Sequence, residues 1–555
     1  MSGHTPSRMP LPVRIGGLSG WLHGNGPRAV LMCGAPGFEG HSAYQSWRIL
    51  ADLIAGRGFS VLRFDYPGEG DSADLPPGAD RLAAAGTSIA EAMDWLKAHT
   101  DAHDVSLVTL RLGTLLAANA LPGLRFARAI HLAPLTSGKA CLREMKAAAR
   151  LYATLPGRAG IHADGGIDLC GYSLTGAEVT ALAIRTTELP AGDATFLALP
   201  PGQTAPDLPG ATHAVFDDYG AMMSMAEGIP PLALWHRIAE WMGPENGQTC
   251  ASAPTETVYQ TPTWRETILR FGPDATLAGV LCEPVATPAK TCVILPNAGS
   301  NPHFGWARMS VDHARALAGA GIASLRFDLS GLGDSLWHAA SPRACLYGRR
   351  HLDDMRHAVD LVVARGCGAP MVAGLCSGGY LALQTMHADP RVTRCVAVNV
   401  LKLVWHDTDD LDVIEQASTQ ASRSYGARAV SASQWKRVLR GEIGLDRIRA
   451  VATLLARRGL RRLCEIIGLE TALPDDTRLV RAQLRAISQR GGQLTFVHSA
   501  MDGSRDEAEL HLGTASRYAC ALSGVDIEVI DGADHELTQK NARDRLQDIL
   551  IDRAR

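Results

Sequence analysis

The sequence predicts an α/β protein with two tandem domains, each a mostly parallel sheet flanked by helices, and with a helical lid on the second. Three observations predict this fold. The glycine-rich residues 374–379 separate two apolar runs, which indicates a strand, a sharp turn and a helix. The alternating apolar and polar residues of 525–530 indicate a further strand. The chain also contains the same layout twice.

The internal repeat decides the architecture. Three pairs of segments match, namely 29–37 with 291–299, 63–72 with 326–335, and 105–114 with the stretch around 374–379. The third pair differs at the centre, because Arg111 stands where the second copy has Cys376, and Thr109 replaces Gly374. The first copy therefore keeps the pattern of the fold and loses the reactive side chain.

Changes in composition place the domain boundaries. Pro, Thr, Ser, Gly and Gln dominate residues 244–262, which we expect to be a linker. We expect a degenerate domain without a nucleophile at 8–243, and a catalytic domain at 263–555 with its helical lid at about 404–490. With 46% hydrophobic residues, the chain of 555 residues can bury two full cores.

Cys376 is the side chain that we expect to carry the chemistry. Its surroundings match a nucleophile elbow, in which a reactive side chain stands on a sharp turn between a strand and a helix. The elbow is crowded, so the positions two before and two after the nucleophile must be small, as Gly374 and Gly378 are. If Ser377 were the nucleophile, Leu375 would occupy the crowded position, so we assign Ser377 a backbone role.

Two further residues complete a candidate catalytic triad, which runs in the order nucleophile, acid and His along the chain. Asp502 ends a strand-like run that starts at 494, and it is the predicted acid, with Asp506 as the alternative. His535 lies in a glycine-containing loop after the last predicted strand, where the general base belongs.

An oxyanion hole requires two backbone N–H groups. We expect one from Ser377, directly after the nucleophile, and the other near Ala298 and Gly299, in the loop after an early strand. His303 lies in the same loop, and two interpretations are open: contact with the substrate, or a structural role.

We assign no catalytic role to the repeated turn at 326–335. We expect Asp328 and Asp334 to accept hydrogen bonds from the backbone there. In the first copy, Arg111 cannot attack a carbonyl, because a guanidinium stays protonated. Arg111 either anchors an anionic ligand or forms a structural ion pair with a carboxylate such as Asp217 or Asp218, and we favour the ion pair.

The predicted lid is basic. Arg457 and Arg458 belong to a group of cations that faces few acids. One interpretation is a solvated helical face, and the sharper one is a site for an anionic group. Trp405 and Trp435 either line an acyl pocket or pack the lid.

Composition excludes several classes. The net charge of −3 argues against nucleic-acid binding, and no long uncharged apolar window predicts a membrane span. The first 14 residues lack the pattern of a signal peptide, so we expect a cytoplasmic protein. The 12 cysteines show no spacing typical of zinc or disulfides, and free thiols fit a reducing cytosol. Four of them have apolar surroundings that predict burial, namely Cys33, Cys292, Cys395 and Cys520.

Both halves resemble α/β-hydrolases of the serine aminopeptidase type, and more narrowly the paired hydrolases encoded with bacterial exosortase and exopolysaccharide systems. The matching stretches are 110–113, 135–144 and 171–175 in the first half, and 296–299, 374–378 and 435–442 in the second. The resemblance implies the fold over most of the chain. The chain departs from these relatives by joining both halves. Its Cys nucleophile is similar to that of dienelactone hydrolases and of aminoacyl shuttles in peptide-synthetase pathways.

These observations predict a hydrolase that acts on an ester or thioester through an acyl-enzyme on Cys376, without a metal or cofactor. The substrate would be a small molecule or a carrier-bound acyl group. One alternative is an acyltransferase or a carrier-linked thioesterase, because a thioester intermediate reacts readily with amines and thiols. Another is a non-catalytic binding or scaffold protein, because the first copy is already a pseudoenzyme domain.

Overall fold

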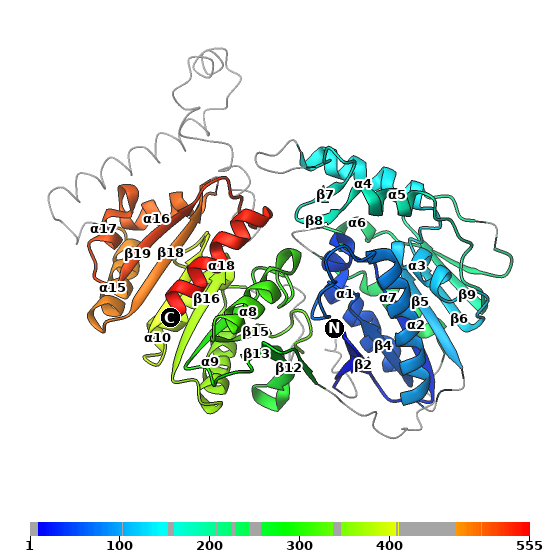
Figure 1. The fold of residues 1–555 in the computed structure, drawn as a ribbon, viewed down its shortest axis with the longest axis horizontal. Helices are drawn as coiled ribbons and strands as arrows, with labels where there is room; N and C mark the ends of the chain where they lie inside the picture. The colour runs from blue at the N-terminus through cyan, green and yellow to red at the C-terminus, as the bar shows by residue number, and fades with distance from the viewer. Residues whose placement is uncertain are drawn as a thin grey trace, which may run out of the picture. The chain divides into compact units, whose positions relative to one another are not determined.

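A computed structural model of the chain describes residues 9–100, 102, 104–153, 160–206, 208–224, 228–243, 257–336, 346–406, 409, 473–500 and 502–555. It contains two compact units, each with sheets and helices (Figure 1). One unit comprises Met1–Lys290 with Leu295–Ala344, and the other comprises Thr291–Ile294 with Cys345–Arg555. The division does not follow the sequence repeat, because the opening elements of the second half belong to the first unit.

The first unit contains an eight-stranded sheet in the order β1-β2-β4-β3-β5-β6-β9-β10. The first three strands in this order pair antiparallel, and every later pair is parallel. The strands are β1 (Leu11–Ile15), β2 (Leu18–His23), β3 (Arg28–Cys33), β4 (Phe59–Phe64), β5 (Val105–Leu110), β6 (Phe126–Leu132), β9 (Gly192–Leu199) and β10 (Thr212–Val215). A small separate hairpin pairs β7 (Ile167–Leu169) with β8 (Tyr172–Leu174).

Helices cover both faces of this sheet, which explains its continuous apolar strands. Alternate residues of β3 enter two different cores, with Leu31 in one and Met32 in the other. Side chains of α2 and α3 join the first core, and those of α1 and α7 join the second. The helices are α1 (Phe38–Ala55), α2 (Arg81–His99), α3 (Leu112–Ala120), α4 (Gly138–Tyr152), α5 (Gly176–Ala183), α6 (Tyr219–Met222) and α7 (Leu232–Trp241).

The first unit also holds the opening strands of the second half. They follow the order β11-β12-β13-β15, and each neighbouring pair is antiparallel. Their bounds are β11 (Val258–Gln260), β12 (Trp264–Phe271), β13 (Leu277–Pro284) and β15 (Ala323–Asp328), with α8 (Met309–Gly319) packed on β13 and β15 and short 3-10 turns at Pro273–Ala275 and Trp306–Arg308. Strand β11 lies inside the segment predicted as a linker, whose residues 244–256 lie outside the described ones.

The second unit is parallel throughout, with strands in the order β14-β16-β17-β18-β19. Their bounds are β14 (Thr291–Pro296), β16 (Ala369–Leu375), β17 (Arg394–Val398), β18 (Gln493–Ser499) and β19 (Val525–Ile530). The helices are α9 (Arg349–Ala364), α10 (Ser377–Ala388), α15 (Asp475–Gln489), α16 (Ser504–Leu512), α17 (Arg517–Cys520) and α18 (Lys540–Ala554), with a 3-10 turn at Thr514–Ser516. Because all the strands run the same way, residues that follow them meet at one edge of the sheet.

Most of the predicted lid lies outside the described residues, including Trp435, Arg457 and Arg458. Its last part is described, and there the expectation of a lid was wrong. Helix α15 packs against α10, α16 and β18, and its Val480, Leu484 and Ile487 are buried. The apolar stripe of α15 therefore covers the sheet as an ordinary flanking helix.

The repeated turn has the same backbone in both copies. After β4, Gly68 and Gly70 have φ of 78° and 46°, and after β15, Gly331 and Gly333 have φ of 83° and 46°. A Cβ atom at Gly70 would lie 2.1 Å from an oxygen of Asp65, and one at Gly333 would lie 2.2 Å from an oxygen of Asp328. The turn therefore requires glycine, both for its backbone angles and for space.

Three of the four cysteines expected to be buried, Cys33, Cys292 and Cys395, are buried, and Cys520 is exposed at the end of α17, so that prediction was wrong. The short helix α17 presents Cys520 to solvent, because only one face of the helix packs on the fold. None of the helices in the described part of the chain has the length and hydropathy needed to cross a bilayer.

Candidate active site

Cys376 lies on a sharp turn between β16 and α10, and its role as a nucleophile stays a prediction. Cys376 has φ of 55° and ψ of −119°, a strained conformation for a residue with a side chain. Its N–H donates to the carbonyl of Val398 at 2.9 Å, which holds the turn against β17. A Cβ atom at Gly374 would lie 2.3 Å from the backbone of Gly378, so the demand for small residues around Cys376 is real. The thiol is half-buried.

The structure brings His535 and Asp502 together. Nδ1 of His535 lies 2.7 Å from Oδ2 of Asp502, and the two side chains are 19% and 1% exposed. Oδ1 of Asp502 accepts the N–H of Ser504 at 2.9 Å, which holds the carboxylate in place. The alternative acid, Asp506, lies in the first turn of α16 and is exposed. The geometry therefore selects Asp502 as the partner of His535.

The thiol of Cys376 affects the pKa of His535, which also pairs with Asp502. Burial alone would lower the pKa of His535, but the Asp502 carboxylate and the hydrogen-bonded Cys376 side chain raise that pKa well above 6.5. Burial would raise the pKa of Asp502, but the charge of His535 and its hydrogen bond lower it. With Nδ1 engaged by Asp502, Nε2 is left for the sulfur of Cys376.

Asn399 is a residue of the site that the sequence analysis missed. It follows β17 with φ of 46° and is fully buried. Its Nδ2 donates to the carbonyl of His535 at 2.8 Å and to Oγ of Ser499 at 2.8 Å, and its Oδ1 accepts the N–H of Ser499 at 2.7 Å. An Asn directly after an apolar strand was the available signal, because Asn tolerates positive φ.

The predicted oxyanion donors are divided between the two units. Ser377 is the first residue of α10, so its N–H lies at the N-terminus of a helix, where partial positive charge collects. Ala298 and Gly299 follow β14 and belong to the first unit. A shared oxyanion hole therefore stays a prediction.

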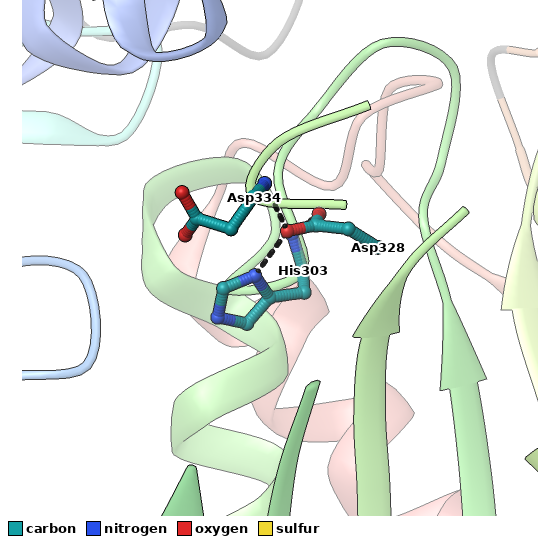
Figure 2. A group of neighbouring side chains, drawn as sticks. All are labelled: His303, Asp328 and Asp334. Atoms are coloured by element: carbon teal, nitrogen blue, oxygen red, sulfur yellow. Dashed lines mark hydrogen bonds and ion pairs between the residues drawn. The ribbon is translucent and has the colours of Figure 1, made fainter. Parts of the chain in front are cut away.

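His303 is buried, and Figure 2 shows its ring beside Asp328. Both of its ring nitrogens have carboxylate partners, so none is left for a substrate. Its Nδ1 lies 2.7 Å from Oδ2 of Asp328, and its Nε2 lies 2.6 Å from Oδ2 of Asp71. Burial opposes the charge on the ring, but Asp71 and Asp328 raise the pKa of His303 well above 6.5. This geometry supports the structural interpretation of His303.

The same network explains the repeated turn. Oδ1 and Oδ2 of Asp328 accept the N–H groups of His303 and Asp334, as expected for a structural turn. The Asp334 side chain instead pairs with Arg63, while Asp71 of the first copy pairs with Arg326 at 2.9 Å. Each turn thus supplies one carboxylate to the arginine that precedes the other turn.

His303, Asp328 and Asp334 also have the spacing of a metal site, with one ligand atom of each within 4.8 Å of the others (Figure 2). A metal ligand needs a free lone pair, and a His ring that donates from both nitrogens has none. Since Asp334 is also paired with Arg63, the donor set fits a network of ion pairs rather than a cation site.

Trp405 stacks on Tyr347, with ring centroids 4.6 Å apart and an angle of 7° between the planes. Tyr347 in turn contacts Tyr380 of α10 at a centroid distance of 5.0 Å. Tyr380 donates its N–H to the carbonyl of Cys376 at 3.1 Å. The aromatic stack therefore reaches the helix that carries the elbow, and a contact of Trp405 with an acyl group stays a prediction.

Arg111 forms the structural ion pair that we favoured, but with other partners than expected. Its Nε lies 2.9 Å from Oε1 of Glu39, and its Nη2 pairs with Glu144. Asp217 and Asp218 are therefore not the partners. The carboxylates come from the first turn of α1 and the middle of α4, which the sequence does not place near β5.

An elbow nucleophile, an acid after a later strand and a His after the last strand form the arrangement of α/β-hydrolases. No family model and no curated protein matches the chain. Its structure is similar to an esterase from Pyrococcus furiosus, at 12% identity and a TM-score of 0.33, over 55% of this chain and 100% of that one. It is also similar to an α/β-hydrolase from Penicillium, at 16% identity and a TM-score of 0.32, over 52% of this chain and 98% of that one. A third similar structure is a dienelactone hydrolase from Anabaena variabilis, at 12% identity and a TM-score of 0.30, over 50% of this chain and 90% of that one.

Proposed function

We propose that the chain is a hydrolase that acts on an ester or thioester through an acyl-enzyme on Cys376. One observation carries the proposal. The ring of His535 is held by Asp502 at 2.7 Å and has the thiol of Cys376 as its other side-chain partner. A thiol, an imidazole and a buried carboxylate in this sequence of contacts activate a nucleophile for attack on a carbonyl.

In the proposed reaction, His535 takes the proton of the Cys376 thiol, and the imidazolium held by Asp502 stabilises the thiolate. The sulfur attacks the acyl carbon. The bond to the alcohol or thiol then breaks while His535 returns the proton to this leaving group. Water, activated by His535, hydrolyses the thioester and releases the acid. The N–H of Ser377 and a donor near Ala298 or Gly299 would hold the oxyanion, each contributing about 10²-fold in rate.

Intact mass spectrometry tests the proposal. The chain is incubated with p-nitrophenyl esters and with acyl thioesters of increasing chain length, and the mass is measured before and after. We expect an increase that equals the acyl group, located on Cys376 by peptide mapping. Cys376→Ala removes the adduct and the turnover, whereas the matched control Cys520→Ala, at an exposed position of α17, leaves both as in the parent.

The same experiment decides between this function and its alternatives. An amine or thiol acceptor that increases product formation above the rate in water would favour an acyltransferase. A Cys376→Ala chain that turns over substrate as fast as the parent would refute the role of the thiol. The absence of both adduct and turnover with every ester and thioester would favour a non-catalytic binding protein.

A further inference from the structure

A cavity of about 240 Å³ is lined by residues of the first unit, and none of the catalytic residues of the proposed function is among them. It opens at the carboxyl ends of three neighbouring parallel strands, because its walls include Gly34 after β3, Asp65 after β4 and Leu110 at the end of β5. Ligands of α/β sheets bind at this edge. The cavity thus has the position of a binding site in the copy that lost its nucleophile.

Several aromatic side chains contribute to the walls. Among them are Trp21, Tyr44, Trp47, Tyr66 and Tyr172. Aromatic faces carry partial negative charge, so they attract organic cations as well as apolar groups. At about 240 Å³ the space is smaller than the about 300–1,000 Å³ of sites for drug-sized molecules, so a ligand must be small.

The charged groups of the cavity are unequally compensated. Its three arginines are occupied, Arg63 by Asp334, Arg81 by Glu178 at 3.2 Å, and Arg308 by Asp74. An anion would therefore find no uncompensated arginine here. His41 does not supply a positive charge either, because burial lowers its pKa to about 4.

Three carboxyl groups line the cavity, and Asp312 pairs with Arg308 at 3.6 Å. The hydrogen bonds to the side chains of the other two, Asp65 and Glu69, come from the backbone. Asp65 accepts the N–H of Asp71 at 3.1 Å, and Glu69 accepts the N–H of Gly37 at 2.9 Å. Within the described part of the chain, neither forms an ion pair with a cation. Burial, together with the charge of Asp71, raises the pKa of Asp65 to about 7, and burial raises that of Glu69 to about 7 as well. A positive ligand would supply the missing partner.

We propose that this cavity binds a small organic ammonium ion, with its nitrogen facing Asp65 and Glu69 and its hydrocarbon part against the aromatic rings. The proposal combines the small volume, the aromatic side chains in the walls and two carboxyl groups that form no ion pair within the described part of the chain. It assigns a ligand-binding role to the first copy and does not depend on the acyl chemistry of Cys376.

Isothermal titration of the full chain tests the proposal, in a Cys376→Ala background so that acyl chemistry does not contribute. The probes are n-butylammonium, butan-1-ol and butyrate, which share one hydrocarbon chain and differ in charge. We expect saturable binding of n-butylammonium, and binding of the other two probes that is weaker by about tenfold or more.

Three variants locate the site. Asp65→Asn keeps an oxygen for the N–H of Asp71 and loses the charge, and Glu69→Gln does the same toward Gly37. Each variant should weaken the binding of n-butylammonium by about tenfold and leave the binding of butan-1-ol unchanged. The control Asp193→Asn, at an exposed pair with Arg125, should bind as the parent does.

Each contrary outcome overturns the proposal. Equal or tighter binding of butan-1-ol or butyrate would show that the cavity does not prefer a cation. Folded Asp65→Asn and Glu69→Gln chains that bind n-butylammonium as the parent does would place the ligand elsewhere. If Asp65→Asn does not fold, Glu69→Gln and the probe selectivity of the parent decide. Absence of saturable binding for all three probes would also refute it.

Discussion

The two elbows of this chain have the same backbone and opposite side-chain chemistry. Arg111 has φ of 52° and ψ of −122°, and Cys376 has φ of 55° and ψ of −119°. Both N–H groups donate to the carbonyl at the end of the next strand, to Leu132 at 3.0 Å and to Val398 at 2.9 Å. The strained turn is thus retained in a copy whose side chain cannot attack a carbonyl, so it belongs to the fold and not to catalysis alone.

The difference lies in what surrounds the elbow. After the next strand, Ala133 and Asn399 have nearly equal φ of 45° and 46°. Only Asn399 has an amide that holds the loop of His535. In the first copy the corresponding space serves charge compensation, since Glu39 and Glu144 neutralise Arg111. The two copies therefore differ in the contacts around the turn and not in the turn itself.

The largest effect should come from removing the charge that orients His535. Asp502→Asn keeps the shape of the side chain but favours the wrong tautomer of the imidazole. We expect turnover with p-nitrophenyl esters to fall by about 10³–10⁴-fold. Asp506→Asn is the matched control, because Asp506 is exposed in the same loop and helix region. An equal loss of turnover in both variants would contradict the prediction that Asp502 orients His535.

The next effect concerns the ion pairs that replaced the nucleophile. Arg111→Ala leaves the half-buried Glu39 without its partner, so the free energy of unfolding should fall by about 1–2 kcal/mol. Arg125→Ala removes an exposed ion pair with Asp193 and should change the free energy of unfolding by less than about 0.5 kcal/mol. Denaturant titration measures both. Unchanged acyl turnover in the Arg111 variant would show that this side chain takes no part in the chemistry.

A smaller effect is expected when the second copy is made to resemble the first at the next strand. Asn399→Ala removes the bonds to His535 and Ser499, and turnover should fall by about tenfold, or about 1.4 kcal/mol. Ala at φ of 46° adds backbone strain of about 1 kcal/mol. Asn399→Gly loses the same amide without that strain. Turnover should therefore fall alike in both variants, while only the Ala variant shows the added loss in unfolding free energy.

The smallest effect is a pH dependence of stability. The pKa of His535 is raised by folding, so its contribution to stability is present below 6.5 and is lost as pH rises through the raised pKa. The pKa of Asp502 is lowered, so its contribution is present above 3.8 and is lost as pH falls through the lowered pKa. Between pH 3.8 and 6.5, the free energy of unfolding of the parent should exceed that of His535→Gln by about 1 kcal/mol. This difference should shrink at higher pH. A difference that grows with pH would contradict the imidazolium–carboxylate pair.

Local signals explain why much of the site was predictable. The strand, glycine and helix pattern around Cys376 is short-range, and the order of Asp502 and His535 follows from their positions after strands. The interactions that the sequence analysis missed join segments far apart in the chain. Asn399 holds His535 across 136 residues, and Glu39 pairs with Arg111 across 72. Hydrophobic periodicity does not encode such pairs, because it reports which face is buried and not which neighbour lies there.

The sequence by itself therefore determined the α/β class, the duplication, the elbow and the residues in line for the triad, because each depends on the pattern of one strand, turn or helix. Tertiary structure alone decided the contact of Asp502 with His535, the burial of His303 between two carboxylates, and the cavity of the first unit. These depend on distances between side chains from separate strands and helices, and only packing sets those distances.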